Sequence, residues 1–101
     1  MLISRWQAPL LPTRQQMALM LESEGLEPQE ETFPPGAKVA DHRHPFDEVR
    51  IVVSGQLSLD IAGNRLLLRA GDRILIPANT RHSKQADGGE PCVCLFAMKA
   101  D

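Results

Sequence analysis

Hydrophobic residues follow two different periods along the chain, one typical of a helix and the other typical of strands. Between Thr13 and Gly25, apolar residues such as Met17 and Met20 recur at helical spacing. Thr13, with Gln16 three residues later, has the pattern of a helix N-terminal capping box, and Gly25 stands where a helix would end. The pattern therefore predicts a helix of about three turns in this segment.

Beyond residue 36, apolar and polar residues alternate over short segments, as they do in strands that are buried on one face. Leu57, Leu59 and Ile61 would share the buried face of one such strand. Turn residues separate the segments about every ten residues, which favours a β-sandwich or barrel. The predicted strands cover residues 48–53, 56–61, 65–68, 73–76, 82–85 and 92–98.

The segment 92–98 (CVCLFAM) is apolar on both faces, so both faces of this strand need a cover. In so small a domain a second subunit could supply one of the covers, and we therefore expect a homodimer. Cys92 and Cys94 would point the same way on this strand. They are interpreted as small apolar side chains kept reduced, with a soft-metal site as the alternative.

Size and charge narrow the classes of partner. A chain of 101 residues is large enough for one hydrophobic core, and its net charge of -2 comes with no basic stripe, so we expect no nucleic-acid partner. The longest apolar runs fall far below the roughly 20 residues of a membrane-spanning helix. The N-terminal residues lack the pattern of an export signal. We expect a cytoplasmic protein that does not bind membranes.

Candidate metal ligands gather in the segment DHRHPFDEVR, residues 41–50. On a strand, His42 and His44 would project to one side, about 7 Å apart at the backbone, so that two ring nitrogens could approach one ion. Glu48 could return a carboxylate to the same point, and His82 follows a predicted strand and a turn. A charged surface turn would explain the same residues, and spacing alone leaves both interpretations open.

Two motifs in the correct order make this chain resemble the cupin superfamily, in particular its small single-domain members. The first motif reads Gly36-x5-His42-x-His44-x3-Glu48-x6-Gly55, and the second reads Gly71-x5-Pro77-x4-His82. The chain departs from the family pattern at Asn79, where a glycine is usual, and at Ala86, where an asparagine is common. Asn79 is a mild change because asparagine tolerates a left-handed backbone.

The resemblance implies an all-β fold, the double-stranded β-helix or jelly-roll barrel of cupins, here with a short N-terminal helix. Residues 1–30 would form an N-terminal arm, with the helix at about residues 14–24 packed on the barrel, and residues 31–101 would form the cupin barrel. It also implies one divalent transition metal ion held by His42, His44, Glu48 and His82. Ligand type alone does not choose among Fe, Mn, Ni, Zn and Cu.

Arg50 would lie on the same side of its strand as Glu48. A buried arginine needs a partner, which could be a neighbouring carboxylate such as Asp60 or an anionic substrate. The run H-x-H-x-x-x-E-V-R also resembles the corresponding stretch of acireductone dioxygenase, a cupin enzyme whose matching arginine lies beside the substrate. That resemblance implies a catalytic role for Arg50, although Ser83 and Lys84 replace the aromatic residues usual after the last histidine.

Together these features predict a metal-dependent enzyme of the oxygenase, isomerase or decarboxylase type, acting on a small anionic or hydroxylated organic molecule. A dioxygenase-like reaction is one form of this prediction. The alternative is a module that binds a small ligand or sequesters a metal without turnover. Arg43, Arg81 and Lys84 are expected at the surface or at the rim of the pocket.

Overall fold

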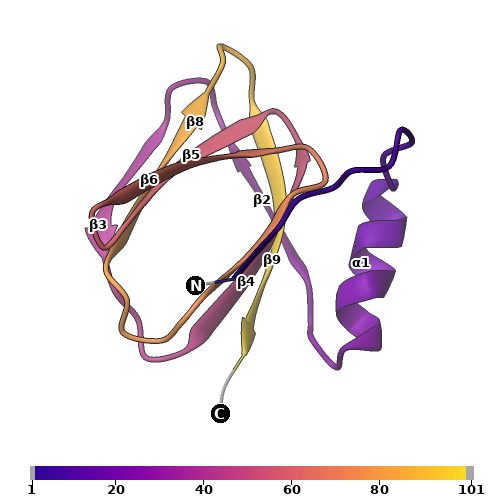
Figure 1. Ribbon diagram of the computed structural model, residues 1–101, viewed down its shortest axis with the longest axis horizontal. Helices are drawn as coiled ribbons and strands as arrows, with labels where there is room; N and C mark the ends of the chain where they lie inside the picture. The colour runs from indigo at the N-terminus through magenta and orange to yellow at the C-terminus, as the bar shows by residue number, and fades with distance from the viewer. Residues whose placement is uncertain (1, 100–101) are drawn as a thin grey trace.

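The computed structural model describes residues 2–99 and folds them into two antiparallel sheets with one helix outside them (Figure 1). The larger sheet has the order β1-β7-β4-β9-β2. Its strands are β1 (Leu2–Ser4), β7 (Arg73–Ile76), β4 (Asp47–Ser54), β9 (Cys92–Lys99) and β2 (Gln29–Phe33). The smaller sheet, in the order β3-β8-β5-β6, consists of β3 (Lys38–His42), β8 (His82–Asp87), β5 (Gln56–Ile61) and β6 (Asn64–Arg69).

The main hydrophobic core lies between the two sheets, and each strand contributes alternate residues to it. On β5, for example, Leu57, Leu59 and Ile61 are all buried, as their alternation predicts. Further members of this core are Phe33, Val52, Leu68, Ile74, Ile76, Ala86, Cys92 and Cys94. This all-β barrel with one short helix confirms the predicted fold class.

A second, smaller core forms on the outside of the larger sheet, where helix α1 (Arg14–Ser23) packs against β4 and β9. The predicted capping box is present, because the Thr13 hydroxyl accepts from the Gln16 main-chain N–H and the Gln16 side chain accepts from the Thr13 N–H. Met17 and Leu21 of the helix contact Leu95 of β9. The helix of the same chain therefore covers the second face of this strand at Leu95, where we expected a second subunit.

The strand predictions for β5 and β7 match the structure, and the others differ by one or two residues at their ends. The six predicted strands include neither β1, a three-residue strand that pairs with β7, nor β2 and β3. The predicted arm of residues 1–30 ends inside β2, and residues 1, 100 and 101 lie outside the described residues. Within residues 2–99, no helix has the length and apolar character needed to cross a bilayer.

One buried carboxylate ties the N-terminal arm to the barrel. Asp72, between β6 and β7, is 4% exposed and accepts hydrogen bonds from the main-chain N–H groups of Trp6 and Arg69 at 3.0 and 2.9 Å. The Arg5 guanidinium donates a third bond at 2.8 Å. Burial raises the pKa of Asp72, but these three donors outweigh it and hold the pKa below its ordinary value of 3.8.

We predict that Asp72→Asn lowers the free energy of unfolding by about 2 kcal/mol at neutral pH, because an amide cannot accept all three bonds. A carboxyl group with a depressed folded-state pKa stabilises the fold above its unfolded pKa, and this contribution disappears as the pH falls through the folded value. Urea unfolding of both proteins should therefore show a gap at pH 7 that shrinks below about pH 4. A gap that does not change with pH would contradict the charged role of Asp72.

Candidate metal centre

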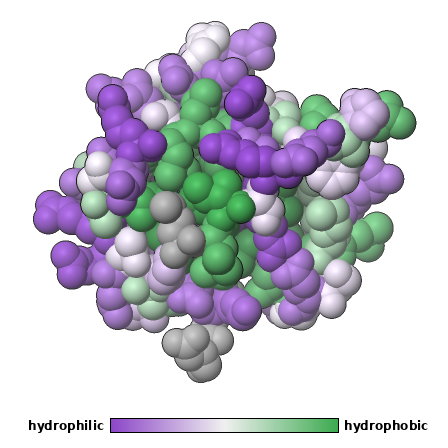
Figure 2. Space-filling view, in the orientation of Figure 1, coloured by the Kyte–Doolittle hydropathy of each residue, from purple (hydrophilic) through white to green (hydrophobic). Residues whose placement is uncertain are grey.

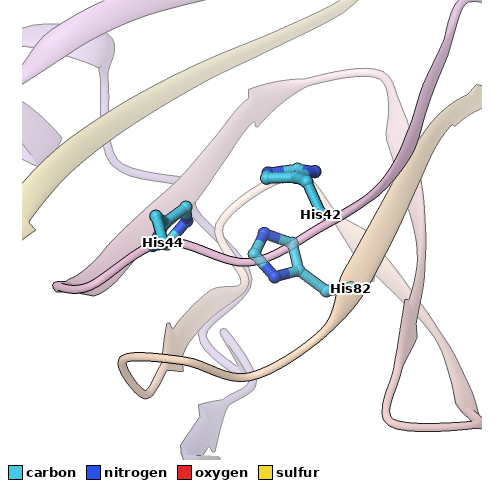
Figure 3. A group of neighbouring side chains, drawn as sticks. All are labelled: His42, His44 and His82. Atoms are coloured by element: carbon cyan, nitrogen blue, oxygen red, sulfur yellow. The ribbon is translucent and has the colours of Figure 1, made fainter.

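The three histidines of the chain meet at one end of the barrel (Figure 3). One ring nitrogen from each of His42, His44 and His82 lies within 4.8 Å of the other two. The ring centroids are 4.3 Å apart for His42 and His82, 5.1 Å for His44 and His82, and 5.6 Å for His42 and His44. His82 is fully buried and the other two rings are half-buried. Residues about 40 positions apart in the sequence thus form one cluster.

Strand pairing brings two of these rings together, and a loop brings the third. His42 is the last residue of β3 and lies directly opposite His82, the first residue of β8. His44 lies in the loop between β3 and β4, so the expectation that both histidines share one strand is wrong. Pro45 follows His44 and has no N–H with which to continue a strand ladder.

The turn of the second motif holds the His44 loop in place. Asn79 adopts a left-handed backbone, with φ of 60°, as predicted for a position where the family usually has glycine. Its main-chain N–H donates to the His44 carbonyl at 2.7 Å, and the Ala78 N–H donates to the Asp47 carboxylate at 2.8 Å. The Phe46 ring stacks on the imidazole of His44, with the centroids 4.1 Å apart. The two motifs are therefore joined by hydrogen bonds beside the histidine cluster.

A main-chain carbonyl faces Nδ1 of each histidine. It fixes the tautomer of His42 and His82, whereas Nε2 of His44 also faces an acceptor, Glu48 Oε1, at 3.2 Å. Since a carbonyl oxygen can only accept, the Nδ1 atom facing it must carry the proton, and the neutral ring then keeps its lone pair on Nε2. The three pairs are His42 Nδ1 with Ala40 O at 2.9 Å, His44 Nδ1 with Phe46 O at 3.0 Å and His82 Nδ1 with Thr80 O at 2.9 Å. This arrangement is typical of histidines that bind a metal through Nε2.

His82 gives the clearest sign of a missing partner. Its Nε2 atom is buried and makes no hydrogen bond, although buried polar atoms nearly always have one. Burial lowers the pKa of His82, which favours the neutral ring that a cation requires. A lone pair in this position would be satisfied by a cation at the centre of the cluster.

Glu48 lies at the edge of the cluster and reaches two of its rings. The carboxylate oxygen Oε1 is 3.2 Å from His44 Nε2 and 3.9 Å from His82 Nε2, while Oε2 faces Arg50. With the tautomers above, the lone pair of His44 faces a carboxylate oxygen, an arrangement that repels unless a cation or a proton lies between them. The structure thus places Glu48 beside the histidines, where one oxygen could join them as a ligand.

Arg50 is fully buried, but its partners differ from those expected. Its Nε donates to Glu48 Oε2 at 2.7 Å, and its Nη1 lies 2.8 Å from Glu31 Oε1, so Asp60 is not a partner. The rings of Phe33 and Phe96 lie 5.7 and 4.9 Å from the guanidinium carbon. Burial opposes the charge of Arg50, but Glu48 above all, with Cys94 and then Glu31, outweighs it and raises the pKa of the guanidinium above its ordinary value. Arg50 therefore carries a permanent positive charge inside the barrel.

Lys84, expected at the surface or rim, is instead 7% exposed and belongs to the same charged network. Its Nζ lies 3.1 and 3.2 Å from the two oxygens of Glu48. Burial and the nearby Arg50 lower the pKa of Lys84, and Glu48 partly restores it. The alternation of β8 could have located this residue, because Lys84 shares the inward face with His82. The carboxylate of Glu48 thus contacts two buried cations, which hold its pKa at about 2 against the effect of burial.

The two cysteines lie in the core below this network. Both are buried and free, with their Sγ atoms 3.7 Å apart. The hydrogen bond from Cys92 lowers the pKa of Cys94 to about 7, against burial and with help from Arg50. No group of three or more metal-ligating side chains in residues 2–99 includes either cysteine. This environment agrees with their interpretation as small core residues.

An apolar cavity lies on the outer side of the larger sheet, and its lining does not include the histidines. It has a volume of about 560 Å³ between the N-terminal arm, helix α1 and the outer face of the larger sheet. Trp6, Met17, Met20, Ile51 and Leu75 are among its lining residues. The metal-ligating groups and this cavity are therefore separate features of the molecule.

The family model for cupin domains (Cupin_2) matches residues 29–98, which include both motifs and all but the first strand of the barrel. This match covers more than half of the chain. The protein therefore belongs to the cupin domain family.

Individual relatives agree with this assignment. The chain is 35% identical over 65 residues to the polyketide synthase CurC of Streptomyces cyaneus; the match covers 63% of this chain but 42% of that protein. An RmlC-like cupin from Shewanella frigidimarina superposes with a TM-score of 0.67 and 22% identity, over 75% of this chain and 67% of the other. KdgF from Halomonas sp. superposes with a TM-score of 0.65 and 25% identity, over 75% and 71% of the two chains.

We predict that Glu48→Ala lowers the free energy of unfolding by about 3–5 kcal/mol, because it leaves Arg50 and Lys84 without their shared counter-charge. Asp41→Ala is the matched control, since Asp41 contacts Arg81 at 3.4 Å on the surface and should change stability by less than about 1 kcal/mol. Urea unfolding measures both effects. Equal losses in the two variants would show that the buried network contributes nothing specific.

Proposed function

We propose that this cupin binds one divalent transition metal ion through the Nε2 atoms of His42, His44 and His82. The observation that carries the proposal is the cluster itself: one ring nitrogen of each histidine lies within 4.8 Å of the other two, and a main-chain carbonyl faces each Nδ1. The buried Nε2 of His82 has no other partner. Imidazole nitrogen suits Fe, Mn, Ni, Zn and Cu, so the donor set fits a metal of this class without naming one.

Glu48 is the fourth ligand in this proposal. Its Oε1 lies on the histidine side, Arg50 holds Oε2, and Lys84 contacts both oxygens. A bound divalent ion of this class would supply Lewis acidity and open coordination positions. Arg50 and Lys84 would orient Glu48 and keep it ionised in the interior.

The charge of the cluster supports a small anionic or hydroxylated organic ligand. Glu31 and Glu48 balance the charges of Arg50 and Lys84, so a divalent ion would leave this end of the barrel positive. A positive, partly dry site attracts anions and strengthens the contacts that hold them. The resemblance of the Arg50 stretch to acireductone dioxygenase supports a catalytic role for Arg50 in an oxygenase, isomerase or decarboxylase reaction.

A second candidate function is ligand binding or metal sequestration without turnover. One observation favours it: Arg50 and Lys84 already contact carboxylates of the chain, and the cavity of about 560 Å³ does not reach the histidines. In this case the ion would be held in a narrow site with little room for an organic substrate. Turnover of small carboxylates by the metal-loaded protein, in air and without oxygen, distinguishes the two functions.

A homodimer remains part of the proposal, on different grounds from those of the sequence. Strand β1 is an edge of the larger sheet and carries Leu2, which is 70% exposed, and Ile3, which is 37% exposed. Apolar side chains reach the surface on this face (Figure 2). Edges of this kind can pair with the same edge of a second copy. A solution mass equal to one chain of 11.2 kDa would contradict the dimer.

We expect calorimetric titration of the metal-free protein with Zn²⁺ to show one strong site. His82→Ala should weaken it about 100-fold or more, because it removes a buried ligand. Arg43→Ala is the matched control, since the exposed Arg43 lies between two ligands in sequence and should leave the affinity unchanged. Glu48→Gln should weaken binding about tenfold if the carboxylate is a ligand. Equal affinity of the wild-type protein and His82→Ala would rule out the proposed centre.

A further inference from the structure

The two carboxylates that contact Arg50 are held very differently. Glu48 belongs to the central strand β4, its side chain is 5% exposed, and it receives a well-formed hydrogen bond from Arg50 Nε at 2.7 Å. Glu31 belongs to β2, an edge strand that pairs only with β9, and its side chain is 40% exposed. Rotation of Glu31 into solvent would break one ion pair and no strand pairing. Glu31 is therefore the partner that Arg50 can exchange.

The contact between Arg50 and Glu31 is also incomplete. Arg50 Nη1 lies 2.8 Å from Glu31 Oε1, yet it makes no hydrogen bond of acceptable geometry and is buried. A buried donor without an acceptor is a rare and unfavourable arrangement. Glu31 thus supplies a negative charge near Nη1 without supplying the aligned oxygen that a guanidinium prefers.

Neighbouring side chains limit how another group could reach this donor. Phe33 and Phe96 lie against the guanidinium, with ring centroids 5.7 and 4.9 Å from its carbon, and Glu48 occupies the Nε side. The side of Nη1 is the one closed by a partly exposed residue, Glu31. A small, flat group with carboxylate oxygens could enter where Glu31 leaves and align with Nη1.

We propose that Glu31 occupies a small-carboxylate site on Arg50, and that an anionic ligand of this protein binds there by displacing it. The inference rests on the proposed function, because it names the residue that the proposed anionic ligand displaces. Without the charge of Glu31, Glu48 alone would face Arg50 and Lys84, and the network would carry one excess positive charge. The site should therefore bind anions even before a metal is added.

The test is a calorimetric titration of the metal-free protein with oxalate. Glu31→Gln should bind oxalate about tenfold more tightly than the wild-type protein, because it removes the competing carboxylate. Glu30→Gln is the matched control: Glu30 is the preceding residue on β2, its side chain is 42% exposed, and it contacts Arg14 away from the site. The same change of net charge at Glu30 should leave the affinity for oxalate unchanged.

Oxalate affinity that is the same in Glu31→Gln and in the wild-type protein would overturn the inference. So would an equal gain in Glu30→Gln, which would reduce the effect to net charge. Because the protein is metal-free, failure of the zinc titration would remove the proposed metal centre and leave this result standing.

A second measurement uses the wild-type protein and does not depend on the folding of a variant. Saturating oxalate should shift two resonances: the carboxyl ¹³C resonance of Glu31, because this carboxylate leaves Arg50, and the Nε–H resonance of Arg50. Unchanged resonances of both groups at saturation would contradict the displacement of Glu31.

Discussion

The buried Glu48 carboxylate is the interaction on which the charged end of the barrel depends. It contacts Arg50 and Lys84, two cations that are almost completely removed from water. An unpaired charge in such a position would be strongly unfavourable; without Glu48, Lys84 would lose the carboxylate that it contacts and Arg50 would keep only the partly exposed Glu31. The bond from Arg50 to Oε2 leaves Oε1 directed toward His44 and His82, with Lys84 beside both oxygens. Electrostatic balance and the geometry of the candidate metal centre thus have one cause.

The interior of the barrel holds both a hydrophobic core and a polar site. Aliphatic residues from both sheets fill the core, and some of them lie directly beside the site: Ile61 pairs with His82, and Ile76 pairs with Glu48. Helix α1 covers the outer face of β4 and β9, so these strands can turn apolar residues outward and present Glu48 and Arg50 inward. Because the helix covers this outer face, a domain of 101 residues can bury both a hydrophobic core and a polar site.

Local sequence rules predicted much of the scaffold. The capping box at Thr13, the alternation of β5 and the left-handed turn at Asn79 are each set by a few neighbouring residues, and all are present. The convergence of the three histidines followed from the order of two motifs and the resemblance to cupins. The features that these rules did not predict depend on contacts between segments that are distant in the sequence.

Lys84 and Glu31 illustrate that limit. The alternation of β8 puts Lys84 on the inward face, but only the distant Glu48, 36 residues earlier, supplies the counter-charge that lets a lysine stay buried there. In the same way, no local pattern connects Glu31 on β2 with Arg50 on β4, because β9 lies between these two strands. His44 was assigned to a strand by its spacing, whereas the chain leaves β3 at His42. The three-dimensional arrangement of the strands, rather than residue type, decided each of these positions.

The central claim is that main-chain carbonyls hold Nδ1 of His42 and His82 protonated, so that their Nε2 lone pairs can bind a metal ion beside His44. Long-range ¹H–¹⁵N correlation spectra of the metal-free protein at neutral pH measure this directly, because protonated and unprotonated ring nitrogens resonate far apart. We expect the Nδ1–H tautomer for His42 and His82, in which Nδ1 is the ring nitrogen that has a hydrogen-bond acceptor. A proton on Nε2 of neutral His42 or His82 would contradict the arrangement from which the metal centre is inferred.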